Sequence, residues 1–293
     1  MSEDSRRLAK QPRPDFLYVG TRKSGSTWLY NVLSVHPQVY LPSSKGLYFF
    51  DRNYERGLEW YLSHFAGSGT AEVRGELSHS YLSAPEAPAR IAALNPDMRL
   101  LVCLREPVER AFSEYLDVVK NGRFDGPFET ALERFPILLD RGRYATHLQR
   151  YVETFGRDRL LVQLLDDLKA DGQGYADEVF AFLGVDSREL PPTALKRRMP
   201  ASEPRSRTVA TAAKRISRLA TAVGLQRLRS RAKRATVVRN VLYRPFAEGG
   251  RPRLDPDLAA QLKEQYTPEV LALDELLGTS TAARWGYRQA SIL

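Results

Sequence analysis

The chain has 293 residues, of which 43% are hydrophobic and 27% charged, a composition typical of a globular protein. Its length suffices for one large α/β domain or two small ones. The formal net charge is +9, but residues 196–239 alone carry +13, so the rest of the chain sums to −4. Basicity confined to one segment argues against a protein that coats nucleic acid over its whole surface.

Targeting signals are missing from the sequence pattern. The first 15 residues are polar and charged and lack the apolar core of a signal peptide. No uncharged run reaches about 18 apolar residues, so we expect no membrane span. The single cysteine, Cys103, lies in an apolar run, which excludes an intramolecular disulfide and indicates a buried thiol in a reducing compartment. We therefore expect a cytoplasmic protein.

Short apolar runs alternate with amphipathic helices along the first 190 residues. We expect strands at 15–20, 38–42, in the first part of 71–82, at 99–104 and at 159–168. Helices are expected from Ser26 or Thr27 to the His36-Pro37 stop, and at 57–65, 85–94, 107–122, 146–156, 175–185 and 255–278. This alternation predicts an α/β fold, with a parallel sheet covered by helices on both faces.

The same patterns predict the domain organisation. Residues 1–14 form a flexible N-terminus, and 15–293 form one domain. Within it we expect an α/β core at 15–190, a basic lid or linker at 191–254 in which strands stop, and a C-terminal helix and tail at 255–293. An amphipathic trace in the basic segment favours a lid helix on the core; contact with an anionic acceptor or an acidic carrier protein is the alternative.

Residues 20–29 read GTRKSGSTWL and follow the first strand directly. At such a strand–loop–helix junction, backbone N–H groups and the helix dipole favour a bound anion. Gly25 lets the backbone approach the anion closely, and Lys23 adds a full charge. Hydroxyl donors come from Ser24, Ser26 and Thr27. We interpret the loop as a phosphate cradle; an ordinary Gly/Ser turn is the alternative.

A second candidate segment, LREPVERAFSEY at 104–115, begins at the end of strand 99–104 and continues into the next helix. Arg105 is expected at the carboxyl edge of the sheet, where ligands of open α/β folds bind. Together with the Ser113 hydroxyl two turns later, it suits a second phosphate. Taken alone, the segment is equally compatible with an exposed helix bearing salt bridges.

The first loop differs from the nucleoside-triphosphatase loop, G-x-x-x-x-G-K-S/T, because Lys23 precedes Gly25 instead of following the last glycine. Strand 99–104 also ends at Arg105, where a Walker-type protein has a carboxylate. Both differences argue against an ATP-dependent small-molecule kinase on a related P-loop fold, which remains as an alternative; it predicts magnesium dependence and an acid at a strand end near Lys23. A further alternative is a non-catalytic anion-binding protein that holds nucleic acid or membrane through 196–239 with steep salt dependence.

Together, KSGSTWL and REPVERAFSEY closely resemble the two signature segments of sulfotransferases that use 3′-phosphoadenosine 5′-phosphosulfate (PAPS). Other stretches, including LSVHPQVYLP, SKGLYFFD, RGELSHSYL and GRYATHLQRYVETFG, are similar to the bacterial and heparan-type branch over residues 15–185. The resemblance implies a P-loop-like three-layer sandwich with a central parallel sheet, plus a helical C-terminal region. It also implies a 5′-phosphosulfate site in the first loop and a 3′-phosphate site in the second segment.

Carried over residue by residue, the resemblance implies that Lys23 is the catalytic lysine. The residues that would line the 5′ site are Arg22, Lys23, Ser24, Gly25, Ser26, Thr27 and Trp28. Arg105 and Ser113 would bind the 3′-phosphate. Arg205 and Arg207, at the start of the basic segment, are expected to close over the cofactor phosphates. No metal is expected, because no cluster with ligand spacing occurs in the sequence.

One position departs from the family pattern. This branch usually has a glutamate base after the lysine of SKGLYFFD, but here Gly46 follows Lys45. The nearest substitutes are Glu76 and His79, which face the same way only if the chain turns at Ser78. Histidine accepts a proton near neutral pH with little tuning, whereas glutamate needs desolvation. If neither is the base, Lys45 or an acidic acceptor that needs no protein base is the remaining explanation.

The sequence thus predicts a transferase that moves a sulfuryl group from PAPS to a hydroxyl or amine and releases 3′-phosphoadenosine 5′-phosphate (PAP). Lys23 and the loop N–H groups would stabilise charge on the leaving oxygen in an in-line transfer. The acceptor is a small molecule or a saccharide, and we expect no nucleic-acid partner. The sequence determines neither the acceptor nor the oligomeric state.

Overall fold

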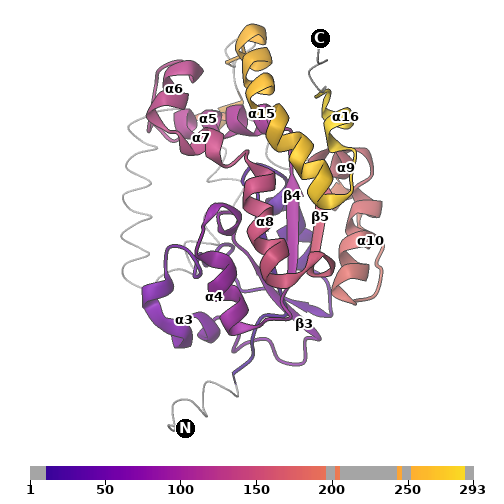
Figure 1. Cartoon of the computed structure of the whole chain (residues 1–293). Helices are drawn as coiled ribbons and strands as arrows, with labels where there is room; N and C mark the ends of the chain where they lie inside the picture. Colours follow the sequence, from indigo (N-terminus) through magenta and orange to yellow (C-terminus); the bar gives the residue numbers. More distant parts are fainter. Residues whose placement is uncertain (1–10, 196–201, 205–242, 246–251, 288–293) are drawn as a thin grey trace. The chain divides into compact units, whose positions relative to one another are not determined.

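The structure, a computed structural model, describes residues 11–195, 202–204, 243–245 and 252–287 (Figure 1). These residues belong to two compact units, one made of segments up to 106, from 143 to 196 and from 267, the other of 107–142 and 197–266. Most of the basic segment, with Arg205 and Arg207, lies outside the described residues, and the predicted domain boundaries stay predictions. In the described part, no helix is both long and apolar enough to cross a membrane.

A five-stranded parallel sheet with the order β2–β3–β1–β4–β5 forms the centre of the first unit (Figure 1). Its strands are β1 (Phe16–Gly20), β2 (Val39–Tyr40), β3 (Val73–Leu77), β4 (Arg99–Leu104) and β5 (Leu160–Leu164). Central strand β1 pairs with β3 on one side and β4 on the other. The strand order reverses there, and in open α/β sheets the ligand crevice lies outside the carboxyl ends at such a switch point.

The two central strands are buried because they are continuous apolar runs. All five residues of β1 are buried, as are all residues of β4 except Arg99. Strands covered on both faces have this composition. Gly75 in β3 allows a close approach, since a Cβ there would lie 2.3 Å from the ring of Phe16.

Helices cover both faces of this sheet. Phe16 and Tyr18 share one core cluster with helices α2 (Ser26–Leu33) and α10 (Gly172–Leu183). Alternate residues of a strand point to opposite faces, so Leu17 and Val19 face the other layer. There, α4 (Ala87–Leu94) packs against α8 (Tyr144–Phe155). The predicted three-layer sandwich is confirmed.

The remaining elements of the first unit are short. They are η1 (Tyr54–Arg56), α3 (Gly57–Ser63), η2 (Tyr81–Ser83), η3 (Arg157–Arg159), α9 (Leu165–Ala170), α11 (Pro192–Leu195) and α16 (Thr281–Trp285). The predicted strand 159–168 was too long, because β5 ends at Leu164 and α9 begins at the next residue. Two aspartates in the first turn of α9 complement the helix dipole, and the Leu164 N–H donates to Asp167 over 3.4 Å.

The second unit contains α5 (Pro107–Lys120), α6 (Phe128–Arg134), α7 (Ile137–Asp140) and the first part of α15 (Pro256–Leu277). It also contains the short antiparallel strands β6 (Ser202–Pro204) and β7 (Tyr243–Pro245), so the prediction that strands stop after residue 190 was wrong. The alternative of an exposed salt-bridged helix at α5 was right about the salt bridge and wrong about its exposure. Arg110 is fully buried and donates to Glu114 over 2.7 Å, and Arg141 pairs with the same carboxylate.

Candidate active site

The loop between β1 and α2 bends through left-handed backbone. Lys23 has φ 71° and Gly25 has φ 91°, and the N–H groups of the first turn of α2 begin immediately after Gly25. A Cβ on Gly25 would lie 2.8 Å from a terminal methyl group of Leu168 in α9, which would have to shift, and the left-handed backbone itself favours glycine. Turns of this kind, next to a helix N-terminus, present backbone N–H groups to an anion.

The side chains of two predicted site residues bind the protein itself. Ser24 is fully buried; its hydroxyl lies 2.5 Å from the Thr21 hydroxyl and donates to the Thr21 carbonyl over 3.1 Å. Trp28 Nε1 donates to the Ala194 carbonyl over 2.7 Å. These contacts shape the loop and anchor α2. Any contact of these residues with an anion would therefore involve their backbone.

Lys45 lies across the start of α2, although it was only a reserve candidate for the base in the sequence. Its ammonium group donates to Ser26 Oγ over 3.1 Å and to Thr27 Oγ1 over 2.9 Å. Burial lowers the pKa of Lys45 to about 7. No carboxylate in the described residues forms an ion pair with it, and an anion at the loop would supply the missing counter-charge.

Arg105 follows the last residue of β4, next to the anion loop. The Thr21 N–H donates to the Cys103 carbonyl over 2.9 Å, which continues the β1–β4 pairing into the loop. The Arg105 carbonyl accepts from the Tyr144 hydroxyl over 2.7 Å, and the Glu106 carboxylate accepts from the Tyr287 hydroxyl over 2.5 Å. Lys23 and Arg105 therefore extend from neighbouring strand ends.

Ser113, the predicted partner of Arg105, lies on α5 in the second unit and is half-buried. Its place beside Arg105 stays a prediction.

Glu76, a candidate base, is 2% exposed at the end of β3. Its carboxylate accepts hydrogen bonds from the Tyr81 hydroxyl over 2.5 Å, the Ser78 hydroxyl over 2.9 Å and the Leu47 N–H over 3.1 Å. Burial raises the pKa of Glu76 to about 7, although these donors oppose the shift. The carboxylate thus ties the segment after Lys45 to β3.

His79, the other candidate base, is half-buried in the turn after β3. Its Nε2 lies 2.8 Å from the Tyr48 hydroxyl, and the Tyr48 N–H donates to Ser78 Oγ over 2.9 Å. The strand ends at Leu77, so the chain does turn at Ser78, and Glu76 and His79 both bond the segment 46–49. The assignment of either residue as the base stays a prediction.

Gly46 and Tyr48 both have left-handed backbone, with φ 80° and φ 51°. For an aromatic residue this conformation costs on the order of 1–3 kcal/mol. The Tyr48 ring fills the space beside Gly46: a Cβ at position 46 would lie 2.7 Å from the ring carbons and 2.9 Å from the hydroxyl oxygen. The sequence analysis did not identify Tyr48 as a site residue. Nothing in the surrounding sequence predicts the left-handed backbone that turns its ring back over Gly46.

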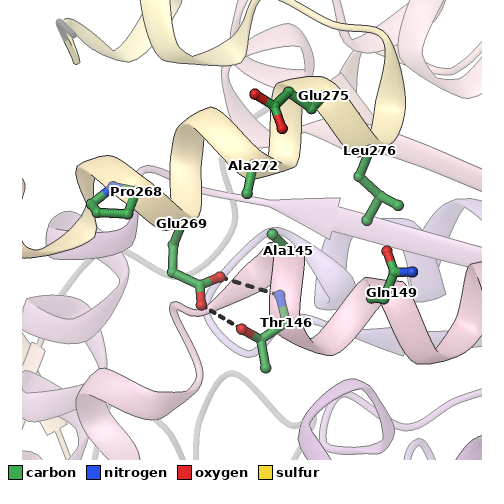
Figure 2. A pocket seen from close by; sticks show the side chains of 8 residues that line it. All are labelled: Ala145, Thr146, Gln149, Pro268, Glu269, Ala272, Glu275 and Leu276. Carbon is green, nitrogen blue, oxygen red and sulfur yellow. Dashed lines mark hydrogen bonds between the residues drawn. The ribbon is translucent and has the colours of Figure 1, made fainter.

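A groove of the first unit lies away from these strand ends. It has a volume of about 560 Å³ and lies between α8 and the C-terminal part of α15 (Figure 2). Figure 2 shows Glu269 bonded to Thr146; the carboxylate accepts from the Thr146 N–H over 3.2 Å. Glu269 and Glu275 line the groove, and its described lining residues include no lysine or arginine. It therefore does not suit a phosphosulfate.

Within the described ranges, no three His, Cys, Asp or Glu side chains are close enough together to hold a metal ion.

Comparison with known proteins gives a consistent result. The sulfotransferase domain model matches residues 13–241. Human heparan sulfate glucosamine 3-O-sulfotransferase 6 is 34% identical over 186 residues, which cover 59% of this chain and 52% of that protein. The bifunctional heparan sulfate N-deacetylase/N-sulfotransferase 4 of Mus musculus is 32% identical over 196 residues, covering 59% and 22%. The chain thus spans about half the length of these relatives, or less.

A solved structure has the same fold. The sulfotransferase from Alicyclobacillus acidocaldarius superposes with a TM-score of 0.70 at 24% identity, covering 94% of this chain and 99% of that one. At this identity the likeness concerns the fold alone.

Proposed function

This chain belongs to the sulfotransferase domain family, and from that premise we propose that it transfers a sulfuryl group from PAPS to an acceptor hydroxyl or amine. The observation that carries the proposal is the pair of cationic strand ends at the switch point of the sheet. Lys23 follows β1 in a loop of left-handed turns, and Arg105 follows the neighbouring strand β4. The family resemblance of both segments supports PAPS as the donor.

The residues of the loop fit the 5′-phosphosulfate. The first-turn N–H groups of α2, the hydroxyls of Ser26 and Thr27 and the ammonium group of Lys45 form one donor cluster. A dianion would restore the charged form of Lys45, which burial disfavours in the ligand-free protein. Arg22 adds a further cation beside Lys23 in the chain.

Lys23 carries the electrostatic part of the mechanism. Negative charge grows on the bridging oxygen as the bond to sulfur breaks, and a lysine placed there stabilises the transition state more than the bound substrate. In-line transfer then requires that the acceptor oxygen be held opposite the leaving oxygen. We propose that this chemistry proceeds without a metal ion.

Arg105 and Ser113 are proposed to bind the 3′-phosphate of the donor. Arginine presents a planar fork of donors that matches phosphate oxygens. Arg205 and Arg207 are proposed to close over the phosphates, and they lie outside the described residues.

The acceptor is proposed to be a saccharide or a small molecule. The relatives named above are heparan sulfate sulfotransferases, which supports a saccharide hydroxyl or amine. A cytoplasmic location and a bacterial origin, both expected from the sequence, stay proposals.

A transfer assay tests this function. Purified chain is incubated with radiolabelled PAPS and acceptor pools of desulfated polysaccharides, oligosaccharides and phenols, in the presence of a metal chelator. We expect labelled product and matching PAP release from at least one pool. Lys23→Ala should abolish both signals. Phosphoryl transfer from ATP and magnesium, with no PAP binding, would favour the kinase alternative and contradict the proposal.

A further inference from the structure

The Tyr48 ring packs over Gly46, and the proposed function gives neither residue a role. The Tyr48 hydroxyl lies 2.9 Å from the point where a side chain at position 46 would begin. A side chain there and the present Tyr48 ring are therefore mutually exclusive. Tyr48 holds the space that residue 46 would otherwise fill with its own side chain.

Several contacts hold Tyr48 in its left-handed backbone. Its N–H donates to Ser78, and its carbonyl accepts from the Arg52 and Asn53 N–H groups over 3.1 and 2.9 Å. The Arg52 guanidinium lies 4.7 Å from the ring centroid. Unfavourable backbone that is held this firmly is concentrated at functional sites. These contacts fix the direction in which the Tyr48 ring points.

The Tyr48 hydroxyl contacts His79, and Arg22 of the loop after β1 acts on Tyr48 electrostatically. The hydroxyl lies 2.8 Å from His79 Nε2, and the two rings meet edge to face with centroids 5.3 Å apart. The charged groups that act on Tyr48 are Arg52 and Arg22, which favour its ionised form, and Glu76 and Asp51, which oppose it. Arg22 precedes Lys23, so the pair lies within electrostatic reach of the loop.

Burial raises the pKa of Tyr48 above its usual value, so its hydroxyl is protonated at neutral pH and can donate to an unprotonated imidazole nitrogen.

Two other titratable groups near Gly46 are less well placed to take the acceptor's proton. Glu76 is only 2% exposed and both of its carboxylate oxygens already accept hydrogen bonds, so an acceptor cannot reach it directly, although burial raises its pKa. Lys45 would be a charged ammonium group beside a bound anion, and such a group has no lone pair. The half-buried His79, connected to Tyr48, is the remaining acceptor.

We propose, on the basis of the proposed function, that Tyr48 contacts the acceptor and that the Tyr48–His79 pair receives the acceptor's proton. The acceptor O–H or N–H donates to the Tyr48 oxygen. As the acceptor atom bonds to sulfur, its proton passes to Tyr48 while the Tyr48 proton passes to His79 Nε2. The bond from sulfur to the bridging oxygen breaks, and its electron pair leaves with PAP. One proton is thus stored on His79 for each sulfuryl group transferred.

The kinetic test compares Tyr48→Phe with Tyr54→Phe. Tyr48→Phe keeps the ring and removes only the hydroxyl, and it should lower kcat by about 10²-fold or more while the Kd for PAP stays within about twofold. Tyr54 is a partly exposed tyrosine of the same segment, and its variant should turn over like the wild type. Full turnover in Tyr48→Phe would overturn the proposal.

A double variant tests the relay. Tyr48→Phe combined with His79→Gln should be no slower than the slower single variant, because both changes interrupt one proton path. Effects that multiply would show two independent roles and contradict the relay.

A measurement that needs no acceptor tests the Tyr48–His79 pair even if none of the acceptor pools gives turnover. Long-range proton–nitrogen NMR of the four histidines reports which imidazole nitrogen carries the proton. In the PAP complex above pH 7, His79 Nε2 should be unprotonated, and its signal should shift in Tyr48→Phe. A proton on Nε2, or an unchanged signal, would overturn the proposal while PAP binding still supports the proposed function. Absence of PAP binding would instead overturn the proposed function, and this proposal with it.

Discussion

Binding of PAP should be coupled to proton uptake by Lys45. The pKa of Lys45 is lowered to about 7 by burial in the ligand-free protein, and a bound dianion against Ser26 and Thr27 would return it toward the usual value for lysine of about 10.4. At pH 8 the free protein carries only about 0.1 proton on this amine. The complex carries one, so binding should take up about 0.9 proton.

The same linkage fixes the sign and size of the pH effect on affinity. Between pH 7 and 9 the charged fraction of Lys45 in the free protein falls from about one half to about 1%, if its pKa is about 7. PAP affinity should therefore fall by about fiftyfold, or roughly 2.3 kcal/mol. Phosphate groups, with a second pKa of about 6, are already ionised over this range and contribute little.

Isothermal titration calorimetry at pH 8 in two buffers of different ionisation enthalpy measures the proton uptake directly. Lys45→Met should remove both the buffer dependence and the pH dependence of Kd. Lys169→Met is the matched control, because Lys169 is half exposed and pairs with Asp166 on α9. It should behave like the wild type. Equal proton uptake in Lys45→Met and the wild type would refute the assignment of Lys45 to the anion site.

Three further outcomes are expected. PAP at a hundredfold excess over its Kd should stabilise the fold by about 2.7 kcal/mol in a chelator, seen as a raised Tm; a shift with ATP and magnesium alone would contradict the donor assignment. Lys23→Ala should chiefly lower kcat and Arg105→Ala chiefly raise the Kd for PAP; the reverse pattern in steady-state kinetics and calorimetry would exchange their roles. In chemical denaturation, Gly46→Ala should cost more stability than Gly57→Ala, because φ is near 80° at both but only at Gly46 would a Cβ meet a ring, that of Tyr48, at 2.7 Å. Equal losses would mean that the ring moves aside freely.

The central strands and the anion loop could be predicted from sequence because their signals are local. Strands 16–20 and 99–104 are uninterrupted apolar runs, which only a sheet covered on both faces buries. Arg105 directly follows the second strand, and Lys23 lies three residues after the end of the first. Once the strands are parallel, the two cations must lie at one edge of the sheet, so this part of the site needed no tertiary information.

The errors in the fold have local causes as well. Residues 160–165 form one apolar run broken only by Gln163, and apolar periodicity alone does not separate the end of β5 from the start of α9. Strands β6 and β7 have three residues each, too short for any alternation to show.

Tertiary structure alone decided what surrounds Gly46. Lys45 reaches hydroxyls 18 and 19 residues away in sequence, and Tyr48 meets a histidine 31 residues away. The low pKa of Lys45 comes from burial, which depends on every element packed around it. The left-handed backbone of Tyr48 has no residue signature, since such residues persist only where the folded surroundings enforce them. The sequence by itself predicted the loop at which an anion is proposed to bind, because its signals are local, and only the fold decided which groups gather beside that loop.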